Sequence, residues 1–143
     1  MTFSDEVEDV LNRAFVAASE AGHANVTPEH IALELIVEDE TSTYLVRCGT
    51  DLVAVESRLR EYLGRIEPNG GTEGDTQPSP AFQRVVEAAF QLTEEDGREC
   101  LMLRDLFFAL IDERGGTASI AILEATREPQ VFEDLRTYPS EDE

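Results

Sequence analysis

Apolar residues recur at helical spacing along most of this chain, and one stretch is apolar on nearly every side. Within residues 26–36, Ile31 and Leu35 stand one helical turn apart, with further apolar residues between and beside them. Thr27 is a suitable N-cap, and Pro28 suits the first helical position, where a backbone N–H would have no partner. The pattern predicts a short helix that is buried on most of its sides.

The same pattern returns in the second half of the chain. Residues 101–111 can be laid over the first stretch with Leu110 on Leu35, a shift of 75 positions. At that shift Val10 meets Val85, Ala14 meets Ala89, Phe15 meets Phe90 and Gly22 meets Gly97. Matches of this kind over some sixty residues indicate an internal duplication.

Apolar stripes and helix-ending residues predict eight helices, four in each half. No segment alternates apolar and polar residues as a strand would. Because one repeat alone would leave its apolar helix uncovered, we expect an all-α fold in which two pseudo-symmetric four-helix repeats form one domain. The expected helix starts are Ser4, Thr27, Ser42 or Thr43, and Asp51, then Ser79, Met102, Thr117 and Pro129.

The whole chain, 1–143, is expected to be a single domain. Between the repeats, Glu67 to Pro78 has no apolar periodicity and several glycines and prolines, which is typical of a linker. Residues 38–40 are polar and are expected to end the second helix. The expected divisions are a first repeat at about 3–64, a linker at about 65–78, a second repeat at about 79–138 and a flexible acidic tail at 139–143.

Charge limits the kinds of partner. The chain has 31 Asp and Glu against 11 Lys and Arg, a formal net charge of −20. Phosphate backbones and anionic lipids repel such a chain, so we expect neither nucleic acid nor a membrane surface as a partner. The acidity suits either solubility in a salty cytoplasm or the attraction of basic partners. Cys48 and Cys100 lack metal-ligand spacing and no secretory signal is evident, which favours a cytoplasmic location with reduced thiols.

Enzyme motifs are not found. The sequence has no phosphate-binding loop, no Gly-x-Ser-x-Gly, no His-Glu-x-x-His and no Cys-x-x-Cys. We therefore expect a binding domain with no catalytic residue, no metal and no cofactor. Two alternatives stay open. His23, Glu29 and His30 are candidate ligands for a metal ion, and Cys48 is a candidate nucleophile paired with His30.

Two capped helix starts are the most informative polar features. Thr27-Pro28-Glu29 and Ser79-Pro80 each offer backbone donors, and Glu29 is expected to add an exposed carboxylate. Such a surface suits docking of a basic or peptide partner. The alternative is that both are simply good caps.

Three features together resemble the amino-terminal repeat domain of the Clp unfoldases. These are Gly22-His23-Ala24-Asn25-Val26-Thr27-Pro28-Glu29-His30-Ile31, the duplicated eight-helix pattern, and Asp75-Thr76-Gln77-Pro78-Ser79-Pro80. The linker end Asp-Thr-Gln-Pro resembles the ClpA type most closely, and the resemblance covers about residues 3–138. It implies a mobile, non-catalytic domain that receives adaptors or substrates for a Clp ATPase ring and the ClpP peptidase.

Resemblance to the ClpA type implies docking of the adaptor ClpS. By that resemblance Glu29 matches a docking carboxylate, Ser79 matches a hydroxyl position beside it, and His23 lies at the same edge. A second acidic docking position falls on Ala24, which departs from the family pattern. The residues expected to bind a partner are Glu29, Ser79, His23, Thr27 and His30.

Other members of the family suggest further alternatives. In ClpC proteins a glutamate in each repeat helps bind phosphorylated arginine; Glu29 fits the first position, but the second falls on Arg104, which would repel a guanidinium group. Phosphoarginine recognition therefore ranks below adaptor docking. A direct receptor for unfolded chains, and a free-standing regulator that acts on a Clp ring in trans, also remain open.

Overall fold

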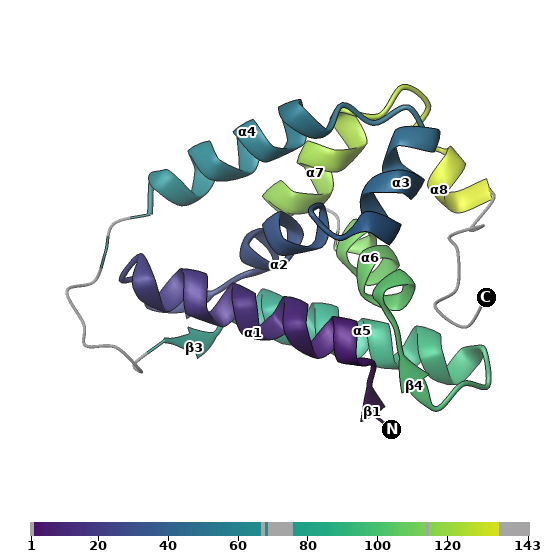
Figure 1. Ribbon diagram of the computed structural model, residues 1–143, viewed down its shortest axis with the longest axis horizontal. Coiled ribbons are helices and arrows are strands. Elements are labelled where there is room, and N and C mark those ends of the chain that lie inside the picture. Colours follow the sequence, from purple (N-terminus) through teal and green to yellow (C-terminus); the bar gives the residue numbers. More distant parts are fainter. Residues whose placement is uncertain (1, 67, 69–75, 114, 135–143) are drawn as a thin grey trace.

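Helices make up most of the structure, a computed structural model that describes residues 2–66, 68, 76–113 and 115–134 (Figure 1). Within those ranges seven helices have at least eight residues, and an eighth is a single turn. They are α1 (Asp5–Glu20), α2 (Pro28–Leu35), α3 (Asp39–Arg47), α4 (Leu52–Gly64), α5 (Pro80–Glu95), α6 (Leu103–Asp112), α7 (Thr117–Glu124) and α8 (Val131–Asp134). The prediction of a mostly helical fold is confirmed.

Two small parallel sheets contradict the expectation that the chain has no strands. β1 (Thr2–Phe3) pairs with β4 (Cys100–Leu101), and β2 (Asn25–Val26) pairs with β3 (Gln77–Pro78). Strands of two residues are too short for alternation to show in a sequence. Each strand directly precedes a helix. One sheet therefore joins the start of α1 to the start of α6, and the other joins the start of α2 to the start of α5.

The duplication is visible in the spacing of the elements. α1 and α5 each have 16 residues, and their N-caps, Ser4 and Ser79, accept hydrogen bonds from Val7 N and Phe82 N. Where the halves meet, Thr50 and Thr126 stand 76 positions apart, form an antiparallel bridge and bring their hydroxyl oxygens to 2.7 Å. Corresponding residues of the two halves therefore contact each other at this place.

The boundary between α2 and α3 differs from the prediction. α2 ends at Leu35 and not within residues 38–40. Asp39 and Glu40 instead form the first turn of α3, where carboxylates are favoured by the positive end of the helix dipole. The predicted start at Ser42 or Thr43 is therefore three or four residues too late.

The second half departs from the prediction at its end. α8 begins at Val131, two residues after the predicted start at Pro129, and is a single turn of four residues. The predicted tail, 139–143, lies outside the described residues, as do residues 67 and 69–75 of the predicted linker. The end of that linker, Gln77–Pro78, forms β3.

The centre of the core is formed by α2 and α6. Ile31, Ala32 and Leu35 of α2 are buried, and α2 contacts α1 and α4 of the first half and α5, α6 and α7 of the second. The prediction of a helix covered on most sides is confirmed. In α6 the buried residues are Leu103, Asp105, Leu106, Phe107, Phe108, Ala109, Leu110 and Ile111.

Long helices lie below this centre in Figure 1, where α1 and α5 run in opposite directions. The rings of Phe15 and Phe82 meet edge to face with centroids 5.8 Å apart, which joins α1 to α5. In the part of the chain that is described, none of the helices has the length and apolar character needed to cross a bilayer.

Shortening a buried side chain of α2 should destabilise the fold. Leu35→Ala is expected to lower the free energy of unfolding by about 2 to 5 kcal/mol, because it removes buried contacts and leaves a cavity. Val53 is 78% exposed, so Val53→Ala should stay within about 0.5 kcal/mol of the parent. Urea denaturation measures both, and equal midpoints for parent and Leu35→Ala would contradict the central position of α2.

Candidate functional site

The β2–β3 pair brings the starts of α2 and α5 together. Gln77 N donates to Ala24 O and Ser79 N donates to Val26 O, each at 3.0 Å. Thr27 and Ser79, the residues directly before the two helices, are both partly exposed. The two capped starts that the sequence singled out are therefore neighbours, although more than fifty positions separate them.

Glu29 contradicts the expectation of an exposed carboxylate. It is only 5% exposed, and its Oε2 accepts a hydrogen bond of 2.9 Å from Ala118 N in the first turn of α7. A carboxylate is favoured there because the first N–H groups of a helix have no partners within the helix and carry partial positive charge. Glu29 therefore ties the start of α2 to the start of α7.

A pocket of about 380 Å³ opens where the starts of α2, α5 and α7 meet. On its wall the Arg84 guanidinium binds one oxygen of Glu113, with Nη2 at 2.7 Å and Nε at 3.0 Å. We call it the cap pocket; its lining residues are Pro28, Glu29, Tyr62, Ala81, Arg84, Glu113, Gly115, Gly116 and Thr117.

Electrostatics in the cap pocket combine buried and exposed groups. Burial raises the pKa of Tyr62, and the Glu29 carboxylate raises that pKa further, so the phenol stays a neutral donor. The Arg84 side chain is 59% exposed, whereas that of Glu113 is less so. Sequence reasoning missed Arg84 and Glu113 because only the fold brings α5 and the end of α6 together.

His23 and His30 form a buried pair. Nδ1 of His23 lies 2.9 Å from Nε2 of His30, and Nδ1 of His30 accepts from Thr27 N at 2.9 Å. A backbone N–H can only donate, so we assign the His30 proton to Nε2, from which it is donated to His23 Nδ1. Neutral His23 then carries its own proton on Nε2. Burial, together with the nearby His23, lowers the pKa of His30 to about 4.

The second half carries an ion pair at the equivalent positions. Arg98 and Asp105 stand 75 positions after His23 and His30, and Arg98 Nη1 binds Asp105 Oδ2 at 2.9 Å. Asp105 Oδ2 also accepts from Met102 N at 2.9 Å, as His30 does from Thr27 N. Asp105 therefore supplies the cap of α6, whose start lacks Thr-Pro.

This geometry supports neither a metal site at His23, Glu29 and His30 nor Cys48 as a nucleophile. Glu29 binds α7 while His23 and His30 bind each other, and among the described residues no three His, Cys, Asp or Glu side chains form a group able to hold a metal ion. Burial raises the pKa of the Cys48 thiol, an effect partly offset by its hydrogen bond with Tyr44. A raised pKa disfavours the thiolate that a nucleophile needs.

The predicted binding residues divide between two places. Glu29 lines the cap pocket, with Thr27 and Ser79 at the adjacent helix starts. His23 and His30 line a different pocket, which shares no lining residue with the first.

Known proteins resemble this chain in sequence. Residues 2–125 match the family of Clp repeat (R) N-terminal domains. A ClpA homolog protein from Fuscovulum blasticum is 26% identical over 128 residues, which is 86% of this chain and 16% of that protein. The chaperone protein ClpB from Chlamydia pneumoniae is 30% identical over 99 residues, 68% of this chain and 11% of that protein. The chain thus spans less than a fifth of the length of either relative.

Solved structures share the fold. The N-terminal domain of Hsp104 from Candida albicans superposes with a TM-score of 0.75 at 15% identity, covering 87% of this chain and 91% of that one. The N-terminal domain of the ClpV1 ATPase from E. coli superposes with a TM-score of 0.74 at 18% identity, covering 98% of this chain and 88% of that one.

Acid should destabilise the fold through His30. Because the pKa of His30 falls from 6.5 to about 4 on folding, the unfolded chain binds more protons in this interval. The fold is therefore most stable above about pH 6.5, where His30 is neutral in both states. As the pH falls toward 4, the free energy of unfolding decreases by at most about 3 kcal/mol. His30→Gln keeps an acceptor for Thr27 N but does not titrate. Urea denaturation from pH 7.5 to 4.5 should show a shallower loss for the variant, and parallel curves would contradict the assignment.

Removing the Glu29 carboxylate should also cost stability. Glu29→Ala leaves Ala118 N without its acceptor, which is expected to cost roughly 1 to 3 kcal/mol. Glu29→Gln retains an acceptor and should lose less, while Glu20→Ala, at an exposed position of α1, should change little. Thermal unfolding compares the three; a Glu29→Ala variant as stable as the parent would show that this hydrogen bond does not hold α7 to α2.

Proposed function

The chain belongs to the family of Clp repeat (R) N-terminal domains, and on that premise we propose that it docks a ClpS-like adaptor or a protein substrate through the cap pocket. It performs no chemistry itself in this role. A Clp ATPase ring and ClpP are its partners indirectly, through the docked protein.

One observation carries this proposal: three helix starts converge on one open pocket. The starts of α2, α5 and α7 contribute Pro28, Ala81 and Thr117 to its lining. Exposed Arg84 and partly buried Glu113 place both signs of charge beside it. A protein partner can bind Arg84 with a carboxylate and Glu113 with a basic side chain, which gives orientation as well as attraction.

Glu29 has an indirect role in this proposal. Because its carboxylate binds Ala118 N, it positions the starts of α2 and α7 and leaves the exposed charges to contact the partner. Ala24 is exposed next to β3 and offers no carboxylate of its own. The affinity for a ClpS-like adaptor then depends more on Arg84 and Ser79 than the family pattern implies.

Phosphoarginine recognition receives less support. The position equivalent to Glu29 in the second half is Arg104, whose positive charge repels a guanidinium group. Glu29 already accepts a hydrogen bond from α7, which leaves its carboxylate fewer acceptor sites for a guanidinium. Adaptor or substrate docking therefore remains the proposed function, whether the Clp ring belongs to the same polypeptide or to another.

Titration with a ClpS-like adaptor from the same organism tests the proposal. We expect saturable one-to-one binding that weakens as salt is added, because exposed charges contribute to it. Arg84→Glu reverses the exposed charge at the cap pocket and should weaken binding about tenfold or more, a loss of at least about 1.4 kcal/mol.

Arg47→Glu provides the matched control. Arg47 is exposed at the end of α3 and lines neither of the two pockets, so its reversal should leave the affinity unchanged although the net charge changes equally. Calorimetry or fluorescence anisotropy measures the dissociation constant of the adaptor for each variant. Equal weakening by the two variants, or no binding at low or moderate salt, would count against docking at the cap pocket.

A further inference from the structure

A second pocket adjoins the cap pocket along α4. It has a volume of about 570 Å³ and lies between α4 and the start of α7. Tyr62 of α4 and Thr117 of α7 line both pockets, so the two form one continuous surface. We call the second pocket the α4 groove; its other lining residues are Ala54, Ser57, Arg58, Glu61 and Arg65.

One side of α4 forms this groove. Ala54, Arg58, Glu61 and Arg65 follow one another at intervals of three or four positions, which places them on the same face of a helix. Ala54 and Ser57 are small and exposed, and they leave space between the longer side chains. A protein segment that leaves the cap pocket over Tyr62 can therefore continue along α4.

Hydrogen-bond donors are numerous in the α4 groove. Ser57 and Thr117 carry hydroxyl groups, and Tyr62 keeps its phenol proton because burial and the Glu29 carboxylate raise its pKa. Such groups can all donate to a carboxylate. The hydroxyl groups thus favour an occupant that brings acceptors.

The two arginines of the groove retain donors for an acidic partner. Arg58 binds Glu124 and Arg65 binds Glu61, in each case through a single guanidinium nitrogen. A guanidinium carries five N–H donors in a planar fork that matches a carboxylate. The Arg58 and Arg65 side chains are 45% and 75% exposed. Because exposed ion pairs contribute little to stability, a carboxylate from a partner can join either arginine without disrupting the fold.

The charge of the whole molecule limits where an acidic segment can bind. The formal net charge is −20, and the chain has no lysine, so its 11 basic residues are all arginines. Arg58, Arg65 and Arg84 all line the α4 groove or the cap pocket. An acidic segment is repelled by the acidic remainder of the surface but can bind these guanidinium groups, which fixes its position.

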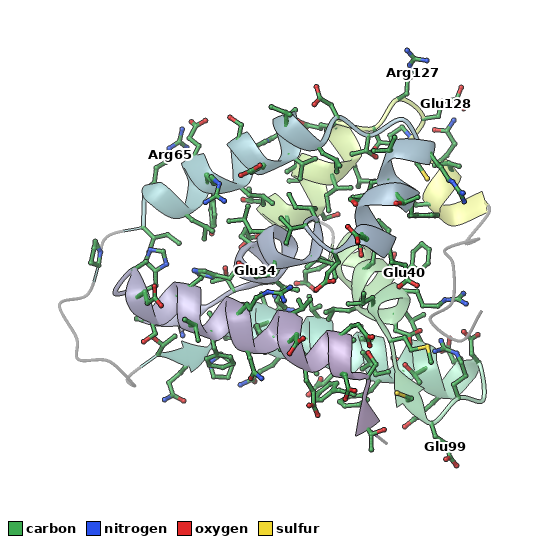
Figure 2. The ribbon with its side chains drawn as sticks, in the orientation of Figure 1. Glu34, Glu40, Arg65, Glu99, Arg127 and Glu128 are labelled. Atoms are coloured by element: carbon green, nitrogen blue, oxygen red, sulfur yellow. The ribbon has the colours of Figure 1, made fainter. Side chains whose placement is uncertain are left out.

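We propose that the protein docked at the cap pocket lays an acidic segment along the α4 groove, where its carboxylates bind Arg58 and Arg65. These residues stand two helical turns apart, about 10 Å along the helix axis, and this distance sets the spacing of the two carboxylates. Tyr62 lies where the pockets meet and donates to the same segment. The inference rests on the proposed function and extends the docking surface from Arg84 to Arg65, which Figure 2 labels at the end of α4.

Filling the groove tests whether the partner covers it. Ser57→Trp places a large side chain in the groove and should weaken binding of the ClpS-like adaptor about tenfold or more, as loss of a central contact does. Ser57 is exposed, so the variant should fold, and circular dichroism checks this. Val53→Trp is the matched control, because Val53 is 78% exposed on the same helix and lines neither pocket. It should bind the adaptor as the parent does.

Charge reversal tests whether the segment is acidic. Arg65→Glu should weaken binding about threefold or more and reduce its salt dependence. Arg60→Glu is the matched control. Arg60 binds Glu56 as Arg65 binds Glu61, four positions earlier on α4, but it lines neither the cap pocket nor the groove. Equal affinities for the two variants would overturn the assignment of an acidic segment, even if Ser57→Trp weakened binding.

The same titration separates this inference from the proposed function. Binding that Arg84→Glu weakens, but Ser57→Trp and Arg65→Glu do not, would refute the α4 groove and leave docking at the cap pocket standing. Weakening by Ser57→Trp and Arg65→Glu but not by Arg84→Glu would place the adaptor on α4 alone and contradict a continuous surface. An adaptor that does not bind the parent chain would refute both.

Discussion

Burial of two short helices is the constraint on which the rest of the structure depends. α2 and α6 are apolar on most sides, so neither half of the chain can cover its own central helix. Each is covered by helices from both halves, and the two halves join through parallel strand pairs in front of α1 and α6 and in front of α2 and α5. This arrangement brings helix starts from distant parts of the sequence side by side.

Helix starts near a core need partners for their first N–H groups, and this requirement explains the polar residues at the site. Glu29 serves the start of α7, His30 accepts from Thr27 N before α2, and Asp105 accepts from Met102 N before α6. The two halves supply the acceptor for the backbone N–H before α2 and before α6 with different side chains. The first half uses a neutral histidine pair and retains a pocket, whereas the second uses an ion pair.

Much of the fold could be predicted from the sequence because its signals are local. The apolar stripe of α1 lies within one helix, and the caps at Ser4, Asp51 and Ser79 each lie within one turn. The repeat shows in the spacing of whole helices. What could not be predicted depends on contacts between distant segments. Only the fold shows that Glu29 is buried against α7 and that Arg84 binds Glu113. Two-residue strands have no sequence pattern that could reveal them.

The most decisive measurement is to map which residues of this chain a ClpS-like adaptor contacts. Backbone amide shifts of the ¹⁵N-labelled chain, followed during titration with a ClpS-like adaptor, should change most in residues 27–30, 79–84 and 115–118, where the starts of α2, α5 and α7 surround the cap pocket. Changes confined to α3 and the first turns of α4, with these three segments unaffected by a bound adaptor, would contradict docking at the converging helix starts.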